Sequence, residues 1–315
     1  MAGLDFEKPI AELEKKIEEL RTFITDKKID LSSDVKRLEE KLGRLKKDTY
    51  ESLSAWQRVQ LARHPQRPYT LDYVGLVMSD FIEVHGDRSF SDDKAMICGL
   101  AKLDGEKVVI IGHQKGKDTK DNLRRNFGCA HPEGYRKALR MMQLAEKFNL
   151  PIIVFIDTPG AYPGIDAEER GQAQAIALNL REMAHIAVPI VATVIGEGGS
   201  GGALGIGVAD RVCVMENAYY SVISPEGCAA ILWKSGAKAP EAAEVLKLTA
   251  QDLMKMGIID EIISEPLGGA HRDPAKAAET LKEVITRHLK ELQGLDKQRL
   301  LQMRYQKYRA MGKME

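Results

Sequence analysis

The sequence predicts an α/β fold with a largely parallel sheet, and three observations support that prediction. Short apolar runs rich in β-branched residues recur at 152–156, 190–195 and 211–216. Amphipathic segments of helical length alternate with them, at 132–149 and 167–184. Glycine-containing turns follow the first two runs directly. Buried strands that alternate with helices and end in tight turns are typical of α/β domains.

Residues 1–48 predict a helical hairpin that precedes this domain. Apolar residues recur every three or four positions among charged ones in two runs: Phe6, Ile10, Leu13, Ile17 and Leu20, and then Leu31, Val35, Leu38, Leu42 and Leu45. So narrow a stripe is typical of two helices that pair along a seam. We expect them to join near Asp26–Asp30. The hairpin either packs on its own domain or docks another subunit, and the sequence favours neither.

Residues 49–293 are expected to form the main domain, in which a region of mixed strands and helices follows a proline-containing linker at His64–Pro68. The dipeptide Asp104-Gly105 predicts a tight turn between strands at Ala95–Leu103 and Lys107–Gly112. This dipeptide accepts the positive φ angles that a two-residue hairpin loop requires.

The remaining part of the chain adds one predicted strand, at Tyr219–Ile223, and a helical region from Pro274 onward. Within residues 294–315, lysine and arginine dominate the charged positions. We expect this last segment to be a basic helix that is either solvated or docked on a neighbour.

The composition is that of an ordinary globular protein. The 315 residues carry as many basic as acidic side chains, so no overall field favours a nucleic acid or a membrane. No apolar run approaches the ~20 residues of a membrane-spanning helix, and the N-terminus lacks the pattern of a signal peptide. The four cysteines are widely spaced, which suits reduced thiols in a cytoplasmic protein better than disulfides or a zinc site. Cys98 and Cys213 fall in strand-like runs and are expected in the core.

Residues 187–208 carry the most informative pattern in the chain. An apolar run ends in a burst of glycine and then becomes rich in alanine and leucine, with the glycines at Gly196, Gly198, Gly199, Gly201 and Gly202. Glycine lets the backbone approach a ligand closely. The first amide groups of the following helix lack intrahelical partners and lie at its positive end. The segment therefore predicts an anion or oxyanion site built from backbone.

Two other interpretations share this pattern. Gly196, Gly198 and Gly201 fit the dinucleotide fingerprint, with Glu216 at a suitable distance for a ribose contact. The spacing argues against it, because only about two helical turns fit before the next strand, whereas a βαβ unit needs ~30 residues. A purely structural interpretation also stands, in which the glycines let a helix pack closely on a strand.

Gly198, Ser200 and Gly202 also fit the nucleophile elbow of a serine hydrolase. That interpretation needs a histidine base. His271 lies in a turn, and His288 falls in a charged helical pattern that is typical of a solvated surface residue. Neither is a convincing base for Ser200.

A basic segment lies between Lys115 and Arg125. Its cations are Lys115, Lys117, Lys120, Arg124 and Arg125. Such a loop could hold phosphates or other anionic groups. The alternative is a solvated loop whose charges Asp118 and Asp121 partly offset.

Four segments, 116–128, 155–172, 194–204 and 220–234, together closely resemble the alpha-subunit family of bacterial acetyl-CoA carboxylase carboxyltransferases. The likeness extends from the second predicted helix to about residue 290. It implies a crotonase-like fold of repeated ββα units, as in the ClpP/crotonase superfamily. Departures are slight: Asp166 stands where a small residue is expected, and Cys129-Ala130 precede His131.

The resemblance implies a reaction and a set of site residues. In this family the carboxyl group of carboxybiotin passes to acetyl-CoA, forming malonyl-CoA for fatty acid synthesis. Gly201 and Gly202 match the catalytic glycines whose amides hold the biotin ureido oxygen, and Ala203 is a further donor. The facing wall is expected from residues of the preceding turn: Gly160, Ala161, Tyr162, Pro163 and Gly164. We expect Gly202→Val to abolish turnover without unfolding the chain.

The resemblance also implies partners. Biotin would arrive as carboxybiotin on the biotin carboxyl carrier protein and not be attached to this chain, and no metal is expected here. A zinc-bearing beta subunit would complete the enzyme, as an α2β2 heterotetramer. Biotin carboxylase would join the larger complex, for which ATP binding is a further expectation.

Overall fold

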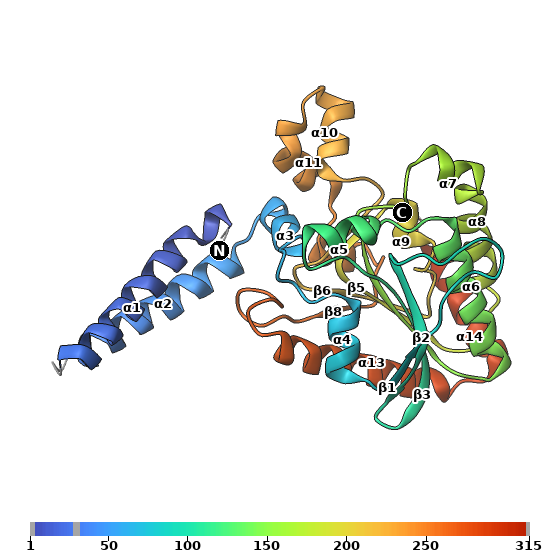
Figure 1. Cartoon of the computed structure of the whole chain (residues 1–315), viewed down its shortest axis with the longest axis horizontal. Coiled ribbons are helices and arrows are strands. Elements are labelled where there is room, and N and C mark those ends of the chain that lie inside the picture. Colours follow the sequence, from blue (N-terminus) through green and yellow to red (C-terminus); the bar gives the residue numbers. More distant parts are fainter. Residues whose placement is uncertain (1–3, 28–31, 313–315) are drawn as a thin grey trace.

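The computed structural model describes residues 4–27 and 32–312, which form an α/β body with a helical hairpin projecting from it (Figure 1). Helices α1 (Lys8–Lys27) and α2 (Ser32–Glu51) lie side by side. An ion pair of 2.6 Å joins Lys46 Nζ to Glu14 Oε1 across them. The predicted junction at Asp26–Asp30 falls partly outside the described residues.

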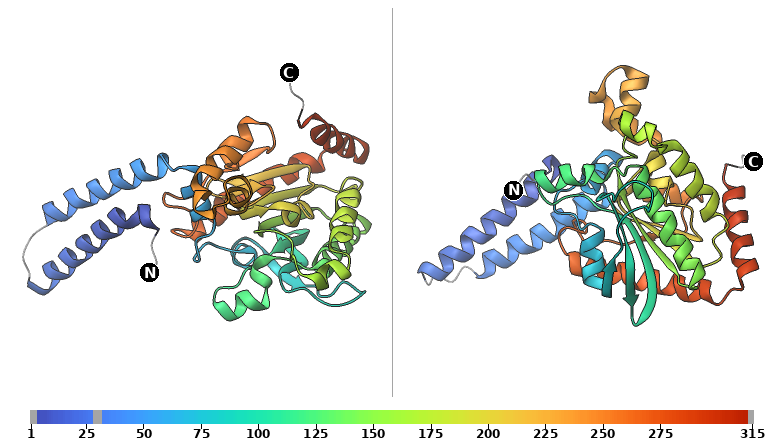
Figure 2. Two further views of the ribbon diagram at one scale, coloured as in Figure 1. Left: turned by 90° about the horizontal axis from the view of Figure 1, so that it is seen from above. Right: turned by 45° about the vertical axis from the view of Figure 1, so that its right-hand side comes forward.

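The base of the hairpin is fixed to the body of the same chain. A short 3-10 helix, η1 (Asp5–Glu7), precedes α1, and Tyr50 Oη donates a 2.6 Å hydrogen bond to Glu7 Oε1. Ile10 and Tyr50 pack on Leu61 of helix α3 (Ala55–Ala62). The far end of the hairpin stands clear of the body (Figure 2).

An eight-stranded sheet forms the centre of the body, in the order β1-β2-β3-β4-β5-β6-β8, with β7 paired to β5. The edge strand β1 and its neighbour β2 pair antiparallel, as do β2 and β3, and the pairings among β3 to β8 are parallel, as the sequence predicts for most of the sheet. The strands are β1 (Ser79–Glu83), β2 (Met96–Leu103), β3 (Glu106–His113), β4 (Ile152–Thr158), β5 (Ile190–Gly199), β6 (Arg211–Met215), β7 (Tyr219–Ser221) and β8 (Glu261–Ile263). The predicted hairpin at Asp104-Gly105 is confirmed, since both residues have positive φ between paired strands.

Helices cover both faces of the sheet (Figure 1). Helices α6 (Pro132–Lys147) and α8 (Gln172–Met183) pack together on one face, and α4 (Thr70–Val77) and α13 (Pro274–Gln293) on the other. Every residue of β4 and β5 is buried between them. The ends of these two central strands are therefore positioned by a closely packed core.

The shorter helices lie mostly at the end of the body where β4 and β5 terminate. They are α5 (Thr119–Arg124), η2 (Asn126–Gly128), α7 (Ile165–Glu169), α9 (Ser200–Leu204), α10 (Pro225–Trp233), η3 (Gly236–Lys238), α11 (Ala239–Leu246) and α12 (Ala250–Lys255). Helices α10 and α11 project beyond the body at the same end as α7 and α9 (Figures 1 and 2).

The C-terminal helix α14 (Lys297–Ala310) is docked, not solvated. Its Arg304 is 2% exposed and forms two hydrogen bonds of 2.9 and 2.7 Å to the Asp210 carboxylate. The same guanidinium donates to the backbone oxygens of Met183, Ile186 and Val188. The basic character of this helix thus serves partly to anchor it on its own domain.

The segment expected to be a linker, His64–Pro68, is partly buried instead: Pro65 and Gln66 are exposed, but His64, Arg67 and Pro68 are buried. Arg67 is fully buried, with Nε donating to the Ile195 oxygen at 2.6 Å and Nη2 donating to Glu265 Oε1 at 2.6 Å. A guanidinium this deep needs such partners, because an unpaired buried charge is very costly.

Two predicted elements have different limits in the structure. The helix expected over 167–184 breaks at Gly171, whose φ of 81° lies in the left-handed region, so α7 and α8 are separate. The strand expected over 190–195 continues to Gly199, because glycine permits close packing on β4. Cys98 and Cys213 are buried in the core, as predicted. Among the helices that the structure describes, none is long and apolar enough to cross a membrane.

Candidate active site at two facing glycine turns

Two turns meet where the parallel strands β4 and β5 end. Thr158 pairs with Gly198 in the ladder, so the turn at 158–164 and the turn at 199–202 leave the sheet side by side. A Cβ built on Gly202 would lie 2.4 Å from the carbonyl carbon of Gly160 and 2.5 Å from the amide nitrogen of Ala161. The structure therefore brings together the predicted residues of both turns.

Several glycines of this segment are required by packing alone. A Cβ on Gly199 would lie 2.1 Å from the Pro159 oxygen, and one on Gly196 would lie 2.6 Å from Asp157 Oδ1. Gly201 differs, because its nearest outside atom, Ile176 Cδ1, is 3.7 Å away. The structural interpretation thus accounts for Gly196, Gly199 and Gly202, whereas Gly201 has room for a Cβ in ordinary van der Waals contact.

Helix α9 begins at this point and holds the amides of interest. It is five residues long, and no side chain caps its N-terminus, so its first amides have neither intrahelical nor capping partners. Tyr135 Oη donates to the Gly202 oxygen at 3.4 Å, and Asn179 Nδ2 donates to the Gly205 oxygen at 2.9 Å. These buried side chains, which the sequence analysis did not identify, hold the short helix in place.

The facing turn is held by its own hydrogen bonds. Thr158 Oγ1 donates to the Gly160 oxygen at 2.7 Å and accepts from the Gly160 amide at 3.1 Å. A Cβ on Gly160 would meet no atom within 4 Å, so this residue borders open space. The Tyr162 ring stacks on His131 with centroids 4.0 Å apart. Tyr162 thus turns toward α6.

The last two predicted wall residues connect the turn to α7. Pro163 is exposed, and Gly164 is the N-cap residue of that helix. A Cβ on Gly164 would lie 2.3 Å from the Tyr162 ring. Gly160 and Ala161 are therefore the members of the predicted wall that contact the Gly202 turn directly, and the other three support them.

A buried ionic cluster lies beneath the two turns. Lys115 Nζ is 2.6 Å from Asp157 Oδ1 and 2.8 Å from Glu197 Oε1. Burial disfavours the ammonium, but the two carboxylates outweigh it and raise the pKa of Lys115. Burial opposes ionisation of Glu197 as well, yet Lys115 and Arg63 lower its pKa to about 2. Burial dominates at Asp157 and raises its pKa.

The basic loop is mostly committed to partners in its own chain. Lys115 points into the ionic cluster, Lys117 Nζ pairs with Asp72 and Arg125 Nε pairs with Asp121 at 3.0 Å. Lys120 and Arg124 are exposed. The five cations therefore do not form one phosphate site in the structure. Most of them pair with carboxylates of their own chain.

The hydrolase interpretation fails on geometry. Ser200 is exposed with a φ of 52°, as a strained elbow residue would be, but His271 stacks on His64 at the base of the hairpin. His288 was expected at the solvated surface, and that expectation is wrong: it is 5% exposed, with Nε2 2.7 Å from Glu261. Neither histidine forms a hydrogen bond to Ser200 in the structure.

Another buried histidine, His113, is a poor candidate for the base as well. His113, at the end of β3, is fully buried, and its pKa is lowered to about 3 by burial and by Lys115. The dinucleotide interpretation fails too, because α9 is five residues long and Glu216 Oε2 accepts the Glu265 amide. Within residues 4–27 and 32–312, no cluster of side chains suits a metal ion.

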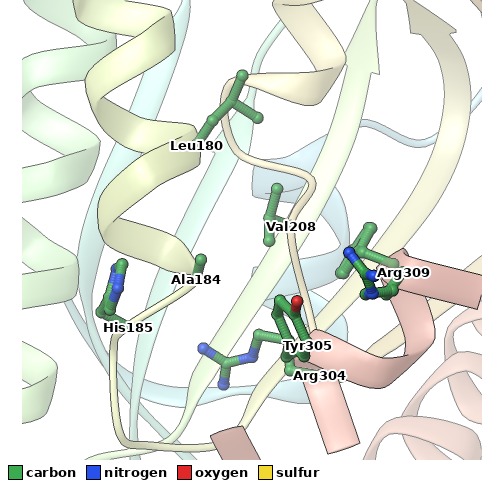
Figure 3. Close-up of a pocket in the computed structure, with 8 residues that line it drawn as sticks. Leu180, Ala184, His185, Val208, Arg304, Tyr305 and Arg309 are labelled. Carbon is green, nitrogen blue, oxygen red and sulfur yellow. The ribbon is translucent and has the colours of Figure 1, made fainter. Parts of the chain in front are cut away.

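A separate groove of about 780 Å³ lies between α8 and α14 (Figure 3). It is lined by Leu180, Ala184, His185, Val208, Arg304, Tyr305, Tyr308 and Arg309. None of these residues belongs to either glycine turn. The groove therefore lies outside the candidate site.

Several solved structures share the fold of this chain. Transcarboxylase 12S, with methylmalonyl-coenzyme A bound, aligns at a TM-score of 0.54 and 22% identity, covering 68% of this chain and 41% of that one. A Pseudomonas malonate decarboxylase heterotetramer in complex with coenzyme A aligns at 0.56 and 16%, covering 68% and 85%. The beta subunit of Pseudomonas aeruginosa geranyl-CoA carboxylase aligns at 0.55 and 18%, covering 74% and 44%. The chain thus spans about two fifths of two of these structures, and the likeness shows a shared fold, as the predicted crotonase-like architecture requires.

Sequence relatives are far more similar. The family model for acetyl co-enzyme A carboxylase carboxyltransferase-like proteins matches residues 3–312. Acetyl-coenzyme A carboxylase carboxyl transferase subunit alpha of Syntrophotalea carbinolica is 60% identical, covering 98% of this chain and 97% of that protein. The subunit of the same name from Thermus thermophilus is 56% identical, covering 98% of each. The chain belongs to this carboxyltransferase family.

Proposed function

We propose that this chain is the alpha subunit of an acetyl-CoA carboxylase carboxyltransferase, which transfers the carboxyl group of carboxybiotin to acetyl-CoA and forms malonyl-CoA. The observation that carries the proposal is the contact of two glycine turns, at which Gly160 borders open space and Gly201 has room for a Cβ. Membership of the family supports the same reaction.

The site residues fit a ligand recognised by backbone. Carboxybiotin, borne by a separate carrier protein, supplies the carboxyl group and leaves a ureido anion that accepts the methyl proton of acetyl-CoA. The amides of Gly201 and Gly202 donate to the ureido oxygen, with Ala203 as a further donor. Fixed backbone dipoles of this kind each supply ~3–4 kcal/mol of transition-state stabilisation. Gly160 and Ala161 form the opposite wall.

No side-chain nucleophile or base is assigned in this chain. Burial lowers the pKa of His113 to about 3, which makes its ring a weak base. Ser200 has no histidine partner. The proposed reaction requires neither, because the ureido anion takes the proton. Ester hydrolysis would need a nucleophile with a base beside it, whereas carboxyl transfer needs neither. The site therefore supports carboxyl transfer over ester hydrolysis.

A partner must complete the site. The acetyl-CoA enolate carries a second negative oxygen, and we assign its donors to a zinc-bearing beta subunit in an α2β2 heterotetramer. Exposed apolar side chains gather on the elements around the turns: Ile165 of α7 is 80% exposed, Leu204 of α9 39% and Leu232 of α10 60%. We assign these exposed apolar side chains to the interface with the beta subunit. The biotin carboxyl carrier protein and biotin carboxylase complete the assembly, which we place in the cytoplasm.

Reconstitution tests the proposal. The purified chain is mixed with its cognate beta subunit, and malonyl-CoA formation from acetyl-CoA and carboxylated carrier protein is measured. We expect no activity from either subunit alone and turnover from the mixture, with co-sedimentation of the two chains. An isolated chain that forms malonyl-CoA as a monomer, or that cleaves simple esters through Ser200, contradicts it.

A further inference from the structure

The ladder between β4 and β5 is interrupted just before the two glycine turns. Ile156 pairs with Val194, but the next pair is Thr158 with Gly198, so β5 carries two extra residues at this point. An irregularity of this kind bends a strand and leaves backbone groups without ladder partners. The ladder resumes for the single pair Thr158 and Gly198, so a side chain that joins the strands at the interruption adds to the ladder in setting the separation of the turns that follow.

Lys115 bridges this interruption. Its ammonium lies 2.6 Å from Asp157 Oδ1, directly before one turn, and 2.8 Å from Glu197 Oε1, directly before the other. Asp157 Oδ1 also accepts the Glu197 amide at 2.9 Å. The three side chains are 11%, 1% and 8% exposed. One cation thus joins the ends of both strands in a nearly dry environment.

The second oxygen of the Glu197 carboxylate is also bound within the cluster. Glu197 Oε2 accepts from Arg63 Nε at 2.7 Å and from Tyr219 Oη at 2.6 Å. Arg63 pairs in turn with Glu226 of α10. Because both oxygens of Glu197 are bound, the carboxylate cannot follow a shift of Lys115 without breaking other bonds.

We infer that Lys115 is a positioning residue, which sets the separation of the two glycine turns and thereby the orientation of the amides at Gly201 and Gly202. The inference rests on the proposed function for its effect on catalysis. A buried ion pair is weak support for stability, because apolar side chains of similar size often do as well. A cation that joins the two strands where their ladder fails has a geometric role that an apolar residue does not reproduce.

Two variants test this role. Lys115→Met removes the bridge but leaves Asp157 and Glu197 without their shared cation, so it risks misfolding. The double variant Lys115→Met with Asp157→Asn removes one positive and one negative charge together, which keeps the cluster's net charge and allows folding. Lys307→Met is the matched control, since Lys307 is 16% exposed, pairs with Asp260 and lies on α14.

Activity is measured in the complex reconstituted with the beta subunit. We expect kcat of the double variant to fall about 10- to 100-fold, toward the loss seen when an oxyanion donor is displaced. KM for acetyl-CoA should change little, because we assign that substrate mainly to the partner. Lys307→Met should keep the native kcat. A native kcat in the double variant overturns the inference.

Amide hydrogen exchange gives a readout that does not depend on activity. In the isolated chain, peptides covering 157–163 and 196–203 should exchange faster in the double variant and at native rates in Lys307→Met. Native exchange in both peptides of the double variant overturns the inference. If the native complex itself forms no malonyl-CoA, the proposed function fails, and these exchange rates still decide whether Lys115 positions the turns.

Discussion

Gly202 and Gly160 pack backbone against backbone, so closely that a Cβ on Gly202 would lie 2.4 Å from the Gly160 carbonyl carbon. The expectation that Gly202→Val leaves the fold intact is therefore wrong. Its side chain would collide with the facing turn before it reached any ligand.

Substitutions at Gly202 and Gly201 distinguish a packing role from a role beside a ligand. We predict that Gly202→Ala displaces the turn, lowers the free energy of unfolding by ~1–3 kcal/mol and abolishes turnover. Gly201→Ala should change stability by less than ~1 kcal/mol, because Gly201 has room for a methyl group. Thermal unfolding of both variants, with activity in the reconstituted complex, checks this. Equal stability of the two variants would contradict the packing argument.

Ser200 adopts a φ of 52°, which glycine accepts without strain. We predict that Ser200→Gly keeps turnover and changes stability by less than ~1 kcal/mol, because relief of the left-handed strain offsets the added freedom of the unfolded chain. Steady-state kinetics and thermal unfolding measure both effects. A loss of several orders of magnitude in kcat would restore Ser200 as a nucleophile.

His271 stacks on His64, with ring centroids 3.8 Å apart, beside Glu7 and Arg272 at the base of the hairpin. Burial, and then the neighbouring His64, lowers the pKa of His271 from 6.5 to about 4. Between these values the unfolded chain binds a proton that the folded chain does not, so the free energy of unfolding decreases as the pH falls.

We predict that His271→Phe makes the melting temperature less dependent on pH between 6.5 and 4, while the ring still stacks on His64. Scanning calorimetry across this window checks it. The exposed His185 provides a control, and His185→Gln should follow the native profile. Parallel profiles for native chain and His271→Phe would show that the stack does not contribute.

Leu232 of α10 is 60% exposed at the end of the molecule that bears the glycine turns. We predict that Leu232→Glu weakens binding of the beta subunit at least ~10-fold, because it places a charge in an apolar interface. Its effect on the isolated chain's stability should stay within ~0.5 kcal/mol, as for most surface substitutions. Ile82→Glu, at a comparably exposed residue of β1, is the control and should bind normally. Sedimentation of each variant mixed with the beta subunit measures the binding.

The glycine turns could be predicted because their signal is local. The lack of a Cβ at Gly199, Gly201 and Gly202 is visible in the sequence, and so is the strand before them. The same holds for the Asp104-Gly105 hairpin, whose turn chemistry stands in two adjacent residues. What the sequence did not reveal is which glycines serve packing and which border a ligand.

The ionic cluster could not be predicted in the same way. Lys115 meets Asp157 and Glu197 across 42 and 82 residues of chain, and no periodic pattern connects such positions. His288 gave a misleading signal, since its charged neighbours suggested solvent while the fold places it against Glu261. Arg67 likewise looked like part of a linker. Buried polar residues are determined by tertiary partners, which local pattern does not contain.

The ion pair between Arg304 and Asp210 affects when the chain can fold during its synthesis. During synthesis, Asp210 emerges from the ribosome well before Arg304, which lies 94 positions later. Until α14 follows, the residue directly before β6 is a carboxylate without its counter-ion, at a cost of ~3–5 kcal/mol if it is buried. The nascent domain therefore cannot close its core around Asp210 until almost the last residue has been added, and a prematurely terminated chain lacks the means to finish folding.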